Sequence, residues 1–181
     1  MKILFVAPHA QLKGYSRLFH QNDEINLGLL SIDAVCKQKG YTTRIMLLSE
    51  QNIEPALKEF KPDVVGITSM TPTFLTAKRI GQRIKKFDSA IITVFGGHHV
   101  SALPEEILVD GAADYVVRGE GEEAFPHLLE AITKGNRTPE IEGVCYIHSG
   151  KPIFTDTKAI VQDLDSLPFM YQDILNNERV F

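Results

Sequence analysis

The residues most able to support chemistry form one short stretch, VFGGHHVSALPEE, at Val94–Glu106. Gly96 and Gly97 follow an apolar run, and His98 and His99 come directly after them. Paired histidines are typical of metal sites, whereas paired glycines let a ligand approach the backbone closely. Neighbouring residues of an extended segment point to opposite sides, and zinc needs three or four ligands, of which no third is evident. The glycines are therefore the stronger signal, although they could serve only a tight strand-to-helix turn.

Two further groups of small and polar residues also follow apolar runs: Ser69, Met70 and Thr71, and then Gly119, Glu120, Gly121 and Glu122. The hydroxyls could be helix caps, and the GEGEE stretch could be a turn followed by an acidic first helical turn. Glu120, Glu122 and His98 could instead do acid–base work, although no nucleophile–base pair of convincing spacing accompanies them. The patterns G-x-x-x-x-G-K-S/T and strand-linked G-x-G-x-x-G are both missing, so a nucleotide site is not supported.

The elements that would position these residues alternate between apolar strands and amphipathic helices. Strands are predicted at Lys2–Ala7, Thr42–Leu47, Asp63–Ser69, Ala90–Phe95 and Asp114–Val117. Helices are predicted at Leu27–Lys39, Ile53–Phe60, Phe74–Phe87, Pro104–Val109 and Glu122–Thr133. Alternation of this kind, with strands rich in valine and isoleucine, predicts an α/β fold with a doubly wound parallel sheet and helices on both faces.

The C-terminal part of the sequence has a different pattern. Val144–His148 and Pro152–Thr155 flank a Ser-Gly-Lys turn and predict a β-hairpin. Beyond Ala159 the sequence has proline, acidic residues and little periodicity, which is typical of a linker. We therefore predict three parts: an α/β binding domain at 1–140, a hairpin appendage at 141–158 and a linker at 159–181.

The composition is that of a soluble globular protein: 181 residues, of which 44% are hydrophobic and 23% charged. The formal net charge of -4 argues against a nucleic-acid partner, because nucleic-acid-binding surfaces are normally basic. No apolar run approaches the roughly 20 residues that span a bilayer, so no membrane partner is expected. Cys36 and Cys145 form neither a disulfide framework nor a zinc site, which favours a cytoplasmic location.

The candidate groups all follow predicted strands, so they should meet at one edge of the sheet. In an open parallel sheet, ligands bind outside the carboxyl ends of the strands, where the strand order reverses. The segment Pro8–Asn26, after the first strand, is longer than most connections, and long ordered loops are usually functional. Small residues and hydroxyls at such an edge suit a large, flat or extended ligand.

Four motifs, in this order, resemble one known family: NLGLLSIDAVCKQKGY, PDVVGITSMT, VFGGHHVSALPEEIL and ADYVVRGEGEEAFPHLL. They resemble the N-terminal cobalamin-binding domain of cobalamin-dependent radical S-adenosylmethionine (radical SAM) enzymes, which include anaerobic magnesium-protoporphyrin IX monomethyl ester cyclases. The closing DLDSLPF resembles the link between that domain and the radical domain. The resemblance covers nearly the whole chain. It implies a flavodoxin-like sheet of order 2-1-3-4-5, with cobalamin across its carboxyl edge and the nucleotide tail running into the domain.

The resemblance also implies roles for particular residues. One loop, which would line the tail, contains Ser69, Met70 and Thr71. A second loop, beside the base and ribose of the tail, contains Gly96, Gly97 and His98. A third, the GEGE loop near the cofactor and the domain interface, contains Gly119, Glu120, Gly121 and Glu122. These residues form the predicted cofactor-binding set.

Two departures from related patterns affect the chemistry. Cobalamin domains of methionine synthase and the mutases carry a D-x-H-x-x-G loop whose histidine binds cobalt. Here Ala7 and Leu12 replace the aspartate and glycine, so His9 is only a possible cobalt ligand. We expect cobalamin with its own base displaced and no protein histidine in that place. The C-x-x-x-C-x-x-C motif for a 4Fe-4S cluster is absent, so we expect a fragment that is not catalytic alone, with the cluster and S-adenosylmethionine in a missing domain.

Three functions from different classes are therefore weighed. The first is the cobalamin-binding module of a radical SAM methyltransferase or cyclase. The second is a small acid–base enzyme that uses Glu120, Glu122 and His98. The third is a cofactor-free, flavodoxin-like interaction domain. The visible spectrum after incubation with hydroxocobalamin separates the first function from the other two.

Overall fold

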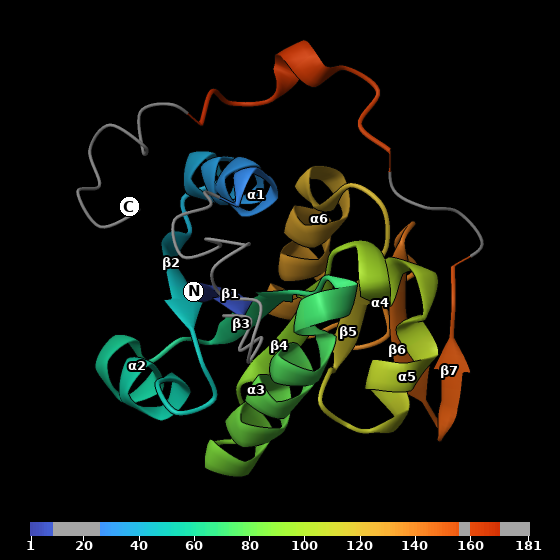
Figure 1. Ribbon diagram of the computed structural model, residues 1–181. Helices are drawn as coiled ribbons and strands as arrows, with labels where there is room; N and C mark the ends of the chain where they lie inside the picture. The colour runs from blue at the N-terminus through green and yellow to red at the C-terminus, as the bar shows by residue number, and fades with distance from the viewer. Residues whose placement is uncertain (9–25, 156–159, 171–181) are drawn as a thin grey trace.

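The computed structural model describes residues 1–8, 26–155 and 160–170. Within these ranges one seven-stranded sheet has the order β2-β1-β3-β4-β5-β6-β7 (Figure 1). Its strands are β1 (Lys2–Pro8), β2 (Thr42–Leu48), β3 (Val64–Thr68), β4 (Ile92–Gly96), β5 (Tyr115–Val117), β6 (Val144–His148) and β7 (Lys151–Ile153). Strands β1 to β5 pair in parallel, whereas β6 and β7 join antiparallel. The predicted order 2-1-3-4-5 is confirmed, and the hairpin extends the same sheet.

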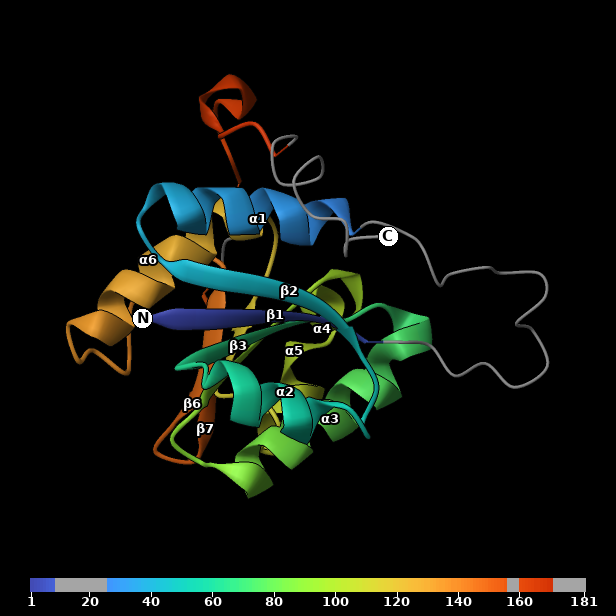
Figure 2. The same cartoon turned by 90° about the vertical axis from the view of Figure 1, so that its left-hand side faces the viewer.

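Helices cover both faces of the sheet, as predicted (Figure 2). They are α1 (Leu27–Gln38), α2 (Ile53–Phe60), α3 (Phe74–Phe87), α4 (His98–Ala102), α5 (Pro104–Val109) and α6 (Gly121–Thr133), with 3-10 turns η2 (Thr71–Thr73) and η3 (Leu164–Ser166). Helices α1 and α6 pack on one face, and α2, α3 and α5 pack on the other. Helix α4, which the sequence did not predict, joins β4 to α5 at the carboxyl edge.

The side chains of each strand point alternately to the two faces of the sheet, and this divides the apolar core into two halves. In β1, Ile3 and Phe5 belong to the half under α1 and α6, whereas Leu4 and Val6 belong to the half under α2 and α3. Successive side chains of a strand point to opposite faces, so a strand buried on both faces is continuously apolar. The two halves of the core therefore share the backbone of the sheet but not their side chains.

Local signals place the starts of α1 and α6 at the carboxyl edge. The Oδ1 of Asn26 accepts a hydrogen bond from the backbone N of Leu29 at 2.9 Å, which satisfies one free amide at the start of α1. Helix α6 begins at Gly121, shortly after β5 ends at Val117. Both helices therefore present their first turns to the edge where the candidate residues were expected.

Two C-terminal features complete the fold. The hairpin turn uses Ser149 (φ 50°) and Gly150 (φ 74°), the pair of left-handed conformations that a two-residue hairpin loop requires. Residues 160–170 pass over α1 and α6 (Figures 1 and 2). No helix in the described ranges is long and apolar enough to cross a lipid bilayer.

Candidate functional site

A cavity of about 490 Å³ extends from the carboxyl ends of β3, β4 and β5 into the half of the core under α1 and α6. Its inner end is apolar. Phe5, Gly66 and Val94 lie beside one another in register on three neighbouring strands. Three helical side chains face them: Leu29, Ile32 and Phe125. The ring centroids of Phe5 and Phe125 are 5.4 Å apart, with the rings tilted by 48°. The inner end therefore offers aromatic and aliphatic surface.

Polar side chains gather at the outer end of the same cavity. Thr68 and Gly96 lie two residues beyond Gly66 and Val94, which places them about 7 Å nearer the carboxyl edge at about 3.3 Å per residue. The polar lining side chains are Asn26, Thr68, His98, Glu120 and Glu122. The cavity thus runs from a polar mouth to an apolar floor.

The two glycines at the end of β4 serve different purposes. Gly97 has φ 99°, and a Cβ there would lie 2.7 Å from the backbone O of Ser69, so the turn itself requires glycine. Gly96 lacks such a constraint, because its Cβ would meet only the backbone O of Val117 at 3.8 Å, an ordinary contact. The absence of a side chain at Gly96 is therefore not explained by the fold, and it keeps the cavity wall open.

The loops after β3 and β4 are joined beyond the end of the sheet. The backbone N of Ser69 donates to the carbonyl O of Gly96 at 2.7 Å, and the backbone N of His99 donates to the carbonyl O of Ser69 at 3.1 Å. Ser69 is fully buried, and its Oγ has no hydrogen-bond partner among the described residues. These bonds fix both loops as one rim along the cavity.

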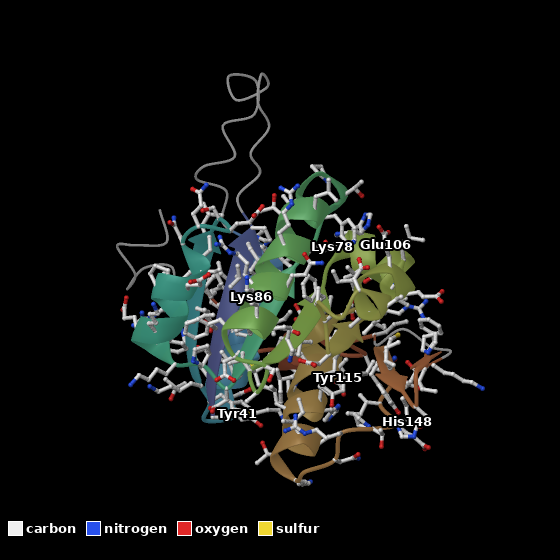
Figure 3. All side chains as sticks on the ribbon, turned by 90° about the horizontal axis from the view of Figure 1, so that it is seen from below. Tyr41, Lys78, Lys86, Glu106, Tyr115 and His148 are labelled. Atoms are coloured by element: carbon white, nitrogen blue, oxygen red, sulfur yellow. The ribbon has the colours of Figure 1, made fainter. Side chains whose placement is uncertain are left out.

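The two histidines begin α4 and face different surroundings. His98 lines the cavity, whereas the Nδ1 of His99 lies 3.3 Å from the Oγ1 of Thr71. The His99 ring also lies 4.0 Å from that of Phe74, with its Nε2 3.9 Å from the Oε2 of Glu106. In Figure 3, which views the molecule from below, Glu106 lies on the face of the sheet that carries α3 and α5. The pair lies in a helical turn rather than the extended segment we predicted, yet the side chains still diverge.

The Nε2 of His99 is buried without a hydrogen-bond partner among the described residues, because the Oε2 of Glu106 at 3.9 Å is too far away to accept a hydrogen bond. The Nδ1 of His99 lies within hydrogen-bond distance of the hydroxyl of Thr71, and which of the two groups donates depends on the tautomer of the ring. No signal in the sequence marked His99 for this contact. In the described ranges, no group of three or more His, Cys, Asp or Glu side chains could hold a metal ion.

Glu120 joins the mouth of the cavity to the C-terminal segment. Its side chain lines the cavity, and its Oε2 accepts a hydrogen bond from the backbone N of Val161. Glu122 and Glu123 occupy the first turn of α6, where negative charge favours the helix dipole. The GEGE loop is therefore both a wall of the cavity and an attachment point for residues 160–170.

Most of the predicted cofactor-binding set surrounds this one cavity. The lining residues from that set are Met70, Gly96, Gly97, His98, Gly119, Glu120, Gly121 and Glu122. Ser69 and Thr71 are not among the lining residues, although both belong to the rim and contact His99 there. Contact with a cofactor stays a prediction for every member of the set. His9 lies outside the described residues.

The residues of the inner wall of the cavity were not predicted from the sequence. They are Phe5, Leu29, Ile32, Gly66, Val94 and Phe125, and in sequence they read as ordinary core positions. Only Gly66 carried a signal, since glycine inside a strand marks a close approach. Here its Cβ would lie 2.9 Å from the Cδ1 of Phe5. A flavodoxin-like sheet with a mostly apolar cavity at its carboxyl edge is the arrangement typical of a domain that binds an organic ligand there.

The comparison with known families identifies that cofactor. Residues 20–129, more than half of the chain, match the family described as B12 binding domain. The chain belongs to this family, and cobalamin is the cofactor of the domain. The predicted family and cofactor are thus confirmed, in preference to a cofactor-free domain or a small acid–base enzyme.

Two relatives and one solved structure indicate the larger proteins in which such domains occur. The chain is 33% identical to an uncharacterized methyltransferase of Pyrococcus horikoshii over 133 residues, covering 73% of this chain and 29% of that protein. It is 32% identical over 142 residues to an anaerobic magnesium-protoporphyrin IX monomethyl ester cyclase of Rubrivivax gelatinosus, covering 72% of this chain and 26% of that protein.

The solved structure is that of the cobalamin-dependent S-adenosylmethionine radical enzyme OxsB with aqua-cobalamin bound. It superposes with a TM-score of 0.75 at 15% identity, over 96% of this chain and 24% of that one, which shows a shared fold. The chain therefore spans less than a third of each of these three proteins.

Proposed function

We propose that the cavity receives the nucleotide tail of cobalamin and that the rim formed by the loops after β3, β4 and β5 lies against the corrin ring. The observation that carries this proposal is the cavity itself, about 490 Å³ with an apolar floor and a polar mouth. Phe5 and Phe125 offer aromatic surface to a flat base. Gly96 leaves open the wall that a side chain would fill.

The residues of the site would act in three ways. Met70, His98 and the GEGE loop line the mouth, where they can contact the polar ribose, phosphate and amide groups of the cofactor. A Cβ at Gly121 would overlap the Cδ1 of Ile32, so the glycine leaves the Ile32 side chain in its place on the cavity wall. Ser69 and Thr71 support the rim through their contacts with Gly96 and His99.

We also propose that this chain is the cobalamin-binding part of a radical SAM methyltransferase or cyclase. The names of the two relatives and the fold shared with OxsB support this proposal. When bound, methylcobalamin would supply the methyl group in the methyltransferase case. Cys36 and Cys145 are buried in opposite halves of the core, so the three thiolates of a 4Fe-4S site would have to come from outside these 181 residues.

The same proposal divides the chain into the parts predicted from the sequence. Residues 1–140 would bind the cofactor, 141–158 form the hairpin, and 159–181 lead toward the radical domain. The hydrogen bond from Val161 to Glu120 supports a fixed starting path for that linker. Both cysteines are free and buried, which fits a cytoplasmic location for the whole protein.

Titration with two corrinoids tests the placement of the tail. Cobinamide has the corrin ring of cobalamin but no nucleotide. We expect the chain to bind hydroxocobalamin at least about tenfold more tightly than cobinamide, a difference of about 1.4 kcal/mol. The visible spectrum follows both titrations. Equal affinities would show that the tail does not use the cavity, and the proposal would fail.

A further inference from the structure

The inner end of the cavity has no polar side chain among the residues that the structure describes. Its walls are Phe5, Leu29, Ile32, Gly66, Val94 and Phe125. The backbone there offers few free hydrogen-bonding groups, because Gly66 lies in β3, which pairs with β1 on one side and β4 on the other. All five polar lining side chains follow the strands or stand at their ends and at helix starts: Asn26, Thr68, His98, Glu120 and Glu122. A group buried at the floor would therefore find no hydrogen-bond partner.

We infer that this floor selects among cobamides by their lower base, accepting benzimidazole-type or phenolic bases and disfavouring purines. Cobamides share the corrin ring of cobalamin and differ in the base at the end of the nucleotide tail. The inference rests on the proposed placement of that tail. It adds a specificity to the site: the identity of the base, read by the apolar residues around Val94 and Phe125.

The physical reason is the cost of burying polar atoms without partners. Dimethylbenzimidazole, released from cobalt, has one free ring nitrogen and two methyl groups, whereas an adenine base has an amino group and three free ring nitrogens. A buried donor or acceptor that loses water and gains no partner weakens binding substantially. Sites without matching polar groups discriminate against ligands in this way. Phe5 and Phe125 favour the methylated aromatic ring instead.

Binding of three ligands to the 181-residue chain tests the inference. The ligands are cobalamin, the adenine-containing cobamide and cobinamide. We expect cobalamin to bind at least about tenfold more tightly than the adenine cobamide, which corresponds to about 1.4 kcal/mol. This comparison needs no variant, so it does not depend on the folding of a mutant.

A matched pair of variants isolates the contribution of the floor. Val94→Thr places a hydroxyl at the inner end with little change in shape. Val65→Thr makes the same change on β3 at a fully buried position in the other half of the core. Each cobamide releases its own base from cobalt at a cost that is the same for every variant, so this cost cancels when the affinity ratio of a variant is compared with that of the unsubstituted chain. We expect Val94→Thr to reduce the ratio at least about threefold and Val65→Thr to leave it unchanged.

The possible outcomes distinguish failure of base selection from failure of the proposed placement of the nucleotide tail. Weak cobinamide binding with equal affinities for the two cobamides would keep the tail in the cavity and overturn base selection. A ratio that both threonine variants change equally would also overturn it, since the effect would then be general destabilisation. Cobinamide binding as tight as cobalamin binding would refute the placement of the tail itself. Thermal unfolding of each variant reports whether the two substitutions cost similar stability.

Discussion

Substitution of Gly96 separates the demands of the ligand from those of the fold. A Cβ at this position would meet only the backbone O of Val117 at 3.8 Å, and Gly96 is not among the residues with positive φ. Alanine therefore fits the folded chain, and since glycine in a strand is less stable than alanine by about 0.5–1 kcal/mol, Gly96→Ala should stabilise it slightly. The added methyl group nevertheless projects on the face that lines the cavity, beside Thr68 and beyond Val94.

We expect binding to weaken as the side chain at Gly96 grows. Gly96→Ala should lower cobalamin affinity modestly, and Gly96→Val at least about tenfold, or about 1.4 kcal/mol. Spectroscopic titration gives the affinities, and thermal unfolding gives the stability of the same samples. Gly97→Val is a weaker test, because φ 99° strains any side chain there whether or not a ligand is bound. A folded Gly96→Val protein with unchanged cobalamin affinity would refute the argument that the glycine keeps the wall open for the tail.

Three further predictions concern the metal centres and the rim. Reconstituted anaerobically, this chain should hold no stoichiometric 4Fe-4S cluster by iron and sulfide analysis, since its two cysteines, Cys36 and Cys145, lie in opposite halves of the core and cannot supply three thiolates. Burial also raises the pKa of both thiols, that of Cys36 to about 12. We expect the continuous-wave EPR spectrum of the cob(II)alamin form to show no triplet splitting from a histidine nitrogen. A triplet splitting that is present in the unsubstituted chain and lost in His9→Ala would instead make His9 the cobalt ligand. His99→Phe keeps the ring packing but loses the contact with Thr71, so it should weaken cobalamin binding about fivefold, whereas His99→Asn should retain most of the affinity. The reverse result, with affinity kept in His99→Phe and lost in His99→Asn, would assign His99 to packing alone.

The helices and parallel strands were predictable because their signals are local. Runs such as Lys2–Ala7 and Ala90–Phe95 are apolar at successive positions, as strands buried on both faces must be. The rule that ligands bind beyond the carboxyl ends of parallel strands then placed the glycine and GEGE loops at one edge. The four-motif resemblance supplied the strand order, which periodicity alone does not determine.

The inner wall and the rim contacts depend on tertiary structure and were missed. Leu29, Val94 and Phe125 look like core residues in sequence, since nothing local distinguishes a side chain against a cavity from one against another side chain. His98–Ala102 form a helix that begins directly after Gly97, whose φ of 99° favours glycine. His99 meets Thr71 across two loops that are far apart in sequence. The difference between Gly96 and Gly97 likewise appears only when their neighbours are known.

The cavity also makes the two halves of the core unequal. Under α2, α3 and α5, side chains such as Ile53, Ile80 and Ile107 are fully buried against protein, while the half under α1 and α6 borders the apolar floor of the cavity of about 490 Å³. A ligand that fills this space acts as a missing piece of the core, so cofactor binding and folding are thermodynamically linked. At a hundred times its Kd, the ligand would stabilise the folded chain by about 2.7 kcal/mol. The amides of α1 and α6 should then gain the most protection from hydrogen exchange. Cofactor supply would therefore affect the stability of this half of the molecule as well as its loading.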